Sequence, residues 1–88
     1  MKTLLLMVKK HWFEQIKSGE KTIDYRDCTE FWINRLISDV LNPDTEHEEL
    51  VFTQFDEVKF LCGKETIVKK FIKTELHEYD GEFRIYFS

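Results

Sequence analysis

The side chains that could do chemistry in this sequence are concentrated in the segment Gly19–Arg26. We expect an extended strand from Lys21 onward, in which alternate side chains point to opposite faces. One face then presents the hydroxyl of Thr22, the carboxylate of Asp24 and the guanidinium of Arg26. Such a guanidinium can grip a phosphate with two parallel hydrogen bonds, and the carboxylate can accept one from an exocyclic amine or a ribose hydroxyl. This segment is the candidate site for a nucleotide-like ligand.

Other side chains nearby in the sequence could complete such a site. Lys21 and Arg35 could share the phosphate, and Tyr25 or Trp32 could stack on an unpaired base. From the residues alone, a surface ion pair between the carboxylate and the guanidinium, beside a solvated lysine, is the simpler interpretation.

The composition limits the kind of protein that this chain can be. Its 88 residues allow one domain, because a shorter piece could not bury enough apolar surface to fold alone. Hydrophobic residues make up 42% and aromatic residues 15%, which predicts an aromatic-rich core. The net charge of -4 argues against a protein that holds nucleic acid by its overall charge, although it is compatible with a local basic groove.

A strand and a short helix are expected to position the candidate segment. The apolar run Thr3–Val8 predicts a strand, and Lys10–Lys17 predicts an amphipathic helix, in which we interpret Trp12 as a core residue. The basic cluster Lys9–His11 is interpreted as a solvated face. Gly19 suits the position just past the end of the helix, where glycine accepts a left-handed backbone at little steric cost. The candidate segment therefore begins at a sharp turn against a helix.

A second helix is expected after Thr29, which can cap it. Its apolar residues follow the i, i+3, i+4, i+7, i+8 spacing of one helix face. These residues are Ile33, Leu36, Ile37, Val40 and Leu41. Asn42-Pro43 would end the helix, and the acidic stretch Asp44–Glu49 is predicted to be an exposed loop that repels phosphate.

The second half of the chain has the pattern of β-strands. The expected strands are Leu50–Phe55, Val58–Cys62, Thr66–Tyr79 and Phe83–Phe87. About five to six strands with two early helices do not alternate as βαβ units. The fold class that we expect is therefore α+β, a small, mostly antiparallel β-barrel with two helices near the N-terminus.

A hairpin is expected between the last two strands. Asp80-Gly81 is typical of a two-residue turn. Such a turn would pair residues of the two strands in a fixed register. The expected pairs are Leu76 with Ile85, Glu75 with Tyr86, and His77 with Arg84.

The string Gly19-x-Lys21-x-x-Asp24-x-Arg26, at a helix-to-strand junction, resembles the hallmark Gly-x-Lys-x-x-Glu-x-Arg of the ASCH domain family. It differs at one position, because the usual glutamate of the family is Asp24 here, one methylene shorter.

Further positions extend the resemblance over residues 1–88. Trp32, Arg35 and the later strand that ends at Gly63 are similar to that family, whereas Lys64 stands where an aromatic residue often follows the glycine. The resemblance implies a PUA-like barrel and a cleft that binds RNA or a nucleotide-like ligand. The implied ligand-binding residues are Lys21, Thr22, Asp24, Tyr25 and Arg26, with Trp32 and Arg35 as the wall.

The same resemblance implies an enzyme as an alternative. Some small ASCH relatives are amidohydrolases acting on acylated cytidine, with a threonine nucleophile at the position of Asp24, and a carboxylate cannot form the same ester intermediate. Others have been proposed as ribonucleases, for which Lys21 would stabilise developing charge and Asp24 would act as general base. A third possibility is a protein-interaction module, which the acidic balance and the loop Asp44–Glu49 favour.

No cofactor or metal is expected. His11, His47 and His77 are scattered without ligand-like spacing. Cys28 and Cys62 are far apart, so we expect reduced thiols. The N-terminal apolar run is too short for a membrane span or a signal peptide, and we expect a cytoplasmic protein.

Overall fold

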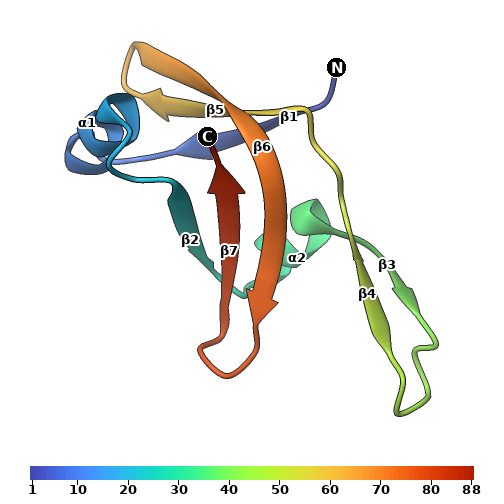
Figure 1. Ribbon diagram of the computed structural model, residues 1–88. Coiled ribbons are helices and arrows are strands. Elements are labelled where there is room, and N and C mark those ends of the chain that lie inside the picture. The colour runs from blue at the N-terminus through green and yellow to red at the C-terminus, as the bar shows by residue number, and fades with distance from the viewer.

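Strands alternate with two short helices along the chain in the computed structural model, which describes residues 1–88 (Figure 1). In chain order the elements are β1 (Thr3–Met7), α1 (Lys10–Ser18), β2 (Ile23–Asp27), α2 (Glu30–Leu36), β3 (Ile37–Leu41), β4 (Glu49–Phe52), β5 (Glu57–Cys62), β6 (Glu65–His77) and β7 (Glu82–Phe87).

The main sheet has five strands in the order β1-β5-β6-β7-β2. β1 pairs with β5 in parallel, and the other neighbours are antiparallel. The long β6 pairs with β5 through Glu65–Lys70 and with β7 through Phe71–His77, and its register shifts between Phe71 and Lys73. β6 therefore belongs to both halves of the sheet and curves between them (Figure 1).

The expected β-barrel is wrong. A closed barrel gives every strand two neighbours, but β1 and β2 each have one and do not pair with each other. β3 and β4 form a separate two-stranded sheet, which stands away from the main sheet in Figure 1. We call this hairpin, residues 37–52, the arm. The helices also do not form a group near the N-terminus, because α1 lies between β1 and β2 and α2 between β2 and β3.

The second helix is shorter than predicted. It ends at Leu36, and the segment expected to continue it, Ile37–Leu41, forms strand β3 against β4. Val40 pairs with Leu50 in this ladder. β-branched residues favour a strand wherever a partner strand is available, and that partner lies beyond a loop. The loop itself is exposed as predicted, and Asn42 enters it with a positive φ of 53°.

The core fills one face of the main sheet beneath the helices. Its buried residues are Leu4, Leu6, Phe13, Ile16, Leu36, Val58, Phe60, Phe71, Phe83, Ile85 and Phe87. The prediction that Phe83, Ile85 and Phe87 of β7 point inward is confirmed, because all three are buried in this core. Trp12 is not among them: it is 42% exposed, so its interpretation as a core residue is wrong.

The register of the last hairpin differs from the prediction by two residues. Leu76 pairs with Phe83, Glu75 with Arg84, and His77 with Glu82, because the turn spans residues 78–81 instead of two. A shift of two residues keeps every side chain on its predicted face, since the side-chain period of a strand is two.

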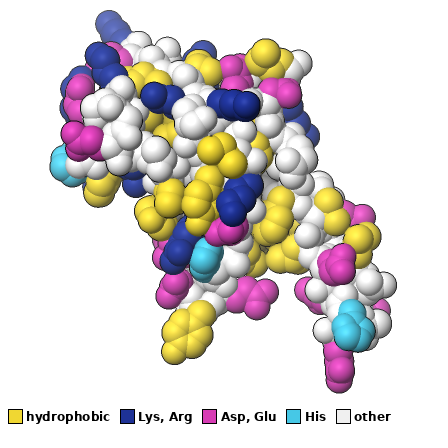
Figure 2. Space-filling view, in the orientation of Figure 1, with side chains coloured by type: hydrophobic (Ala, Val, Ile, Leu, Met, Phe, Trp, Pro, Cys, Tyr) yellow, Lys and Arg dark blue, Asp and Glu magenta, His cyan; other side chains and the backbone are white.

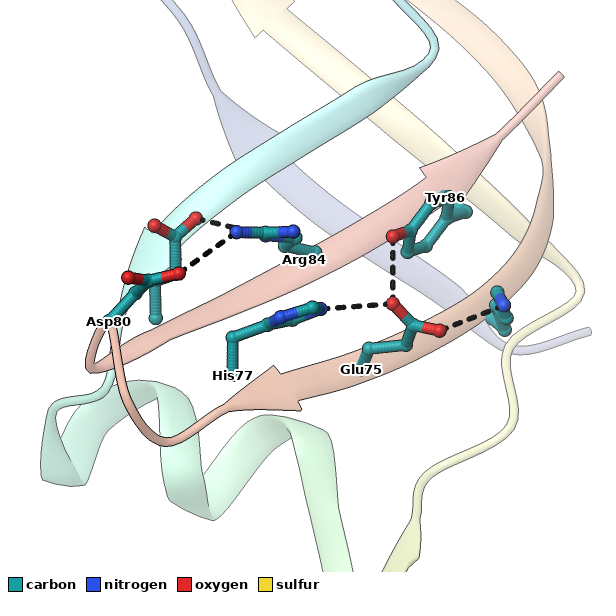
Figure 3. A network of polar contacts seen from close by, with 7 residues as sticks. Glu75, His77, Asp80, Arg84 and Tyr86 are labelled. Carbon is teal, nitrogen blue, oxygen red and sulfur yellow. Dashed lines mark hydrogen bonds and ion pairs between the residues drawn. The ribbon is translucent and has the colours of Figure 1, made fainter.

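The outer face of this hairpin carries a network of polar contacts (Figure 3). Glu75 accepts hydrogen bonds from Lys73 Nζ at 2.9 Å and from Tyr86 Oη at 2.7 Å, and His77 Nε2 lies 3.0 Å away. These contacts hold the pKa of Glu75 down to about 2 and raise the pKa of Lys73 and of Tyr86. The network therefore ties β6 to β7 through a charged carboxylate.

The same face continues toward the turn. Arg84 forms ion pairs with Asp80 at 3.1 Å and with Glu82 at 3.4 Å. Its guanidinium also lies 5.6 Å from the ring of Tyr25 on β2. Charged and aromatic side chains thus cover the side of the sheet that the core leaves open.

We expect the variant Glu75→Gln to be less stable than the wild type at pH 7 and equally stable near pH 2. The folded pKa of Glu75, about 2, lies below its ordinary value of 4.5, so the unfolded chain binds more protons between these values. The stabilisation is present above pH 4.5 and is lost as the pH falls toward 2. Thermal unfolding of both proteins across this range measures it. The control is Glu78→Gln, an exposed neighbour without an ion pair. A pH dependence shared by both variants would contradict the prediction.

Candidate functional site

A pocket of about 480 Å³ lies between the two open ends of the main sheet and α1. Its lining comes from the end of β1, the start of α1, and β2 with the segment before it. The lining residues are Met7, Val8, Lys9, Trp12, Lys21, Asp24, Tyr25 and Arg26. We call it the motif pocket, because half of its residues belong to the segment Gly19–Arg26.

The turn after α1 brings this segment back against the helix. Gly19 has a φ of 87°, a left-handed conformation that side chains disfavour, and its N–H donates to the carbonyl of Ile16 at 3.2 Å. The N–H of Lys21 donates to the carbonyl of Gln15 at 3.1 Å. The predicted role of Gly19 is confirmed. The turn places the side chain of Lys21 beside the exposed Trp12 of the helix.

The carboxylate of Asp24 is buried and paired. Asp24 is only 4% exposed. Both of its carboxylate oxygens accept hydrogen bonds from Arg26: Oδ2 from Nε at 2.6 Å and Oδ1 from Nη2 at 3.2 Å. A buried carboxylate is tolerated only with such compensation, because its desolvation is costly. The two charges neutralise each other.

Arg26 also joins the two ends of the sheet. Its Nη2 donates to the backbone carbonyl of Met7 at 2.8 Å, which connects β2 to β1. On the other side, Trp32 packs against the core with its ring 5.2 Å from the guanidinium. No hydrogen bond within the protein uses the Nη1 group of Arg26, which leaves donors for a ligand in the pocket.

Lys21 is the pocket's half-buried cation without a carboxylate partner. Its ammonium lies 4.7 Å from the ring centre of Trp12 and 5.0 Å from that of Tyr25. Rings at these distances attract a cation through their negative faces. Burial lowers the pKa of Lys21, and the positive charge of Arg26 adds to this effect while Asp24 opposes it. The lysine is therefore oriented, and its charge is not neutralised by an ion pair.

The predicted site residues fall into three groups. Lys21, Asp24, Tyr25 and Arg26 line the motif pocket. Trp32, predicted as part of the wall, is outside the pocket lining and packs against the guanidinium of Arg26. Thr22 and Arg35 also lie outside the lining: Thr22 is exposed, and the guanidinium of Arg35 lies 3.6 Å from the ring of Phe31 on its own helix.

The residues that sequence reasoning missed are on β1 and α1. Met7, Val8, Lys9 and Trp12 line the pocket. Lys9 is exposed, as its solvated interpretation predicts, but it also reaches the pocket rim, whereas the core interpretation of Trp12 is wrong. A signal for Trp12 was present: it precedes the buried Phe13 by one residue, or about 100° around the helix, which is the margin of the buried face. No local pattern indicates that β1 and β2 approach each other.

Comparisons of this chain with models of protein families, with curated proteins and with solved structures find no match. What the pocket can bind therefore follows from its geometry and charge. No His, Cys, Asp and Glu side chains gather in a group of three or more that could hold a metal ion. Neither helix has the length and the apolar character needed to cross a bilayer.

We expect Arg26→Ala to destabilise the protein by about 3 to 5 kcal/mol, because it leaves the charge of a buried Asp24 without a partner. The double variant Asp24→Asn/Arg26→Ala should recover part of this loss, since the amide carries no charge to bury. Urea unfolding of the wild type, the two single variants Arg26→Ala and Asp24→Asn, and the double variant measures the difference. Strictly additive effects of the two substitutions would show that the pair is not coupled.

Proposed function

We propose that this chain is an ASCH-like domain that binds RNA or a nucleotide-like ligand in the motif pocket. The observation that carries this proposal is the position of Lys21, a cation without a carboxylate partner held between two half-exposed aromatic rings. Trp12 is 42% and Tyr25 51% exposed, so both rings have surface left for a ligand. The pocket volume of about 480 Å³ is within the range of small-ligand sites, about 300 to 1,000 Å³.

The ligand's parts match the groups around the pocket. A phosphate would meet the ammonium of Lys21 and the free Nη1 donors of Arg26, with Lys9 at the exposed rim. A base would stack on Trp12 or Tyr25, because every base offers a π-face to an aromatic ring. Asp24 contributes indirectly, since its carboxylate orients the guanidinium.

The balance of charge supports a ligand that makes few phosphate contacts. The protein has a net charge of -4, and of its 13 Lys and Arg residues only Lys9, Lys21 and Arg26 line the pocket. Each neutralised phosphate of a single strand contributes about -0.7 to the slope of log affinity against log salt. One or two contacts predict a slope of about -0.7 to -1.4 for single-stranded RNA.

The alternative of a hydrolase has weaker support. A general base needs a carboxylate oxygen that is free to take a proton, and both oxygens of Asp24 accept from Arg26.

We also propose that the protein is located in the cytoplasm. Cys28 and Cys62 are free thiols, the state that a reducing compartment maintains.

The first test is a titration of the wild type with single-stranded RNA and with nucleoside monophosphates. Lys21→Ala should weaken binding about 10- to 150-fold, because a hydrogen bond to a charged group contributes about 1.5 to 3 kcal/mol. The matched control is Lys17→Ala, an exposed lysine of α1 outside the pocket. Chromatography of each mixture detects products. Equal affinity of the two variants would show that the ligand does not bind in the motif pocket. Formation of a product would show that the protein is an enzyme.

The pH dependence of binding should follow Lys21. Its pKa is lowered in the free protein, and a bound phosphate favours the charged form and raises this pKa again. Above the free-protein pKa the neutral lysine must take up a proton to bind, so affinity should fall as the pH rises through this value. Lys21→Arg should remove this decrease, because an arginine stays charged. Identical alkaline profiles for the two proteins would contradict the prediction.

A further inference from the structure

A second pocket, of about 440 Å³, lies between the arm and the end of β6. We call it the arm groove. Leu50 and Phe52 of β4 line one side. The other side consists of Thr74, Glu75, Leu76, His77 and Glu78, at the end of β6 and just beyond it. It shares no residue with the motif pocket, so the two sites can be tested separately.

The end of β6 has an unpaired edge. Its first half, Glu65–Lys70, pairs with β5, but its second half, Phe71–His77, pairs in a ladder with β7 alone. On the edge away from β7, the N–H of Phe71 donates to the carbonyl of Asp56. In an antiparallel strand, alternate residues direct their N–H and C=O groups to the edge away from the partner. β4 likewise has a single partner, β3. The groove is thus bordered by backbone that can accept another strand.

Thr74 is an unsatisfied polar residue on this groove. It is 6% exposed, and its hydroxyl is buried without a hydrogen-bond partner. Buried polar groups are nearly always paired, so an unpaired one calls for a partner. The main chain of a segment lying along the groove would bring donors and acceptors close to this hydroxyl.

The surroundings of the groove select the chemistry of an occupant. Leu50, Phe52 and Leu76 are half-buried and apolar. The arm contains no Lys or Arg, and its charged residues are all acidic. They are Asp39, Asp44, Glu46, Glu48 and Glu49. Figure 2 shows acidic side chains toward the free end of the arm and no Lys or Arg there.

We infer that the arm groove binds an extended segment of a partner protein, in which apolar residues alternate with Lys or Arg. The segment adds as a strand to the free edge of β6, so its main chain supplies hydrogen bonds. Because side chains alternate along a strand, its apolar residues contact Leu50, Phe52 and Leu76. Its basic residues face the carboxylates of the arm. The arm of a second copy fits this groove poorly, since it would place carboxylates against carboxylates.

The probe is the capped peptide Lys-Val-Lys-Val-Lys-Val-Lys, followed by fluorescence anisotropy. Leu50→Lys places a positive charge in the groove and should weaken binding about tenfold or more. Val51→Lys makes the same change of net charge on the opposite, exposed face of β4, and should leave affinity within about twofold. Equal weakening by both variants, or no binding to the wild type, would overturn the inference.

Two further measurements separate strand addition from simple charge attraction. A peptide methylated on alternate backbone nitrogens should lose binding, and so should one with its lysines and valines in separate blocks. Thr74→Val should raise the Tm of the free protein, because it removes an unsatisfied hydroxyl. The same substitution should weaken the binding of the peptide, which would lose a partner for its main chain. Retained binding of the methylated peptide would refute strand addition. A dimer of the wild type that Leu50→Lys dissociates would assign the groove to a second copy instead.

Discussion

The contact on which the structure depends is the one from Arg26 to both Asp24 and the backbone of Met7. β1 and β2 are the two ends of the main sheet. The guanidinium of Arg26 connects them with one hydrogen bond, to the carbonyl of Met7, and two more hydrogen bonds hold it against Asp24 on its own strand. The burial of Asp24 is possible because Arg26 balances its charge. A single side chain therefore holds together the two strands that a ladder of backbone hydrogen bonds would join in a closed barrel.

The same contact divides the charges of the motif into two roles. Arg26 and Asp24 neutralise each other, so they add little net charge to the pocket, while Lys21 keeps its own. An anionic ligand therefore meets a local positive charge on a protein whose net charge is negative. The acidic arm lies on the other side of the molecule from α1 (Figure 1). Salt screens the repulsion between exposed charges that are farther apart than about 8 to 10 Å at physiological ionic strength.

Local rules predicted local features well. Gly19 ends α1 in a left-handed conformation, and β7 alternates between core and surface, because each depends on residues that are close in sequence. One local prediction, the register of the last hairpin, is wrong by two residues, because its turn is longer than two residues. The other errors concern contacts between distant residues. Ile37–Leu41 has a spacing that suits a helix, but pairing with β4 makes it a strand. The position of Trp12 beside Lys21 depends on the approach of α1, β1 and β2, which no local pattern encodes.

The failure of the barrel prediction and the existence of the motif pocket have the same cause. Hydrogen-bonded strands lie about 4.8 Å apart, so a direct ladder between β1 and β2 would leave no space between them. The side chain of Arg26 spans a wider gap, and the pocket of about 480 Å³ occupies it. The arm groove also lies at unpaired strand edges, those of β6 and β4. In a chain of 88 residues, the unpaired strands of the sheet thus supply the surfaces on which a ligand can bind.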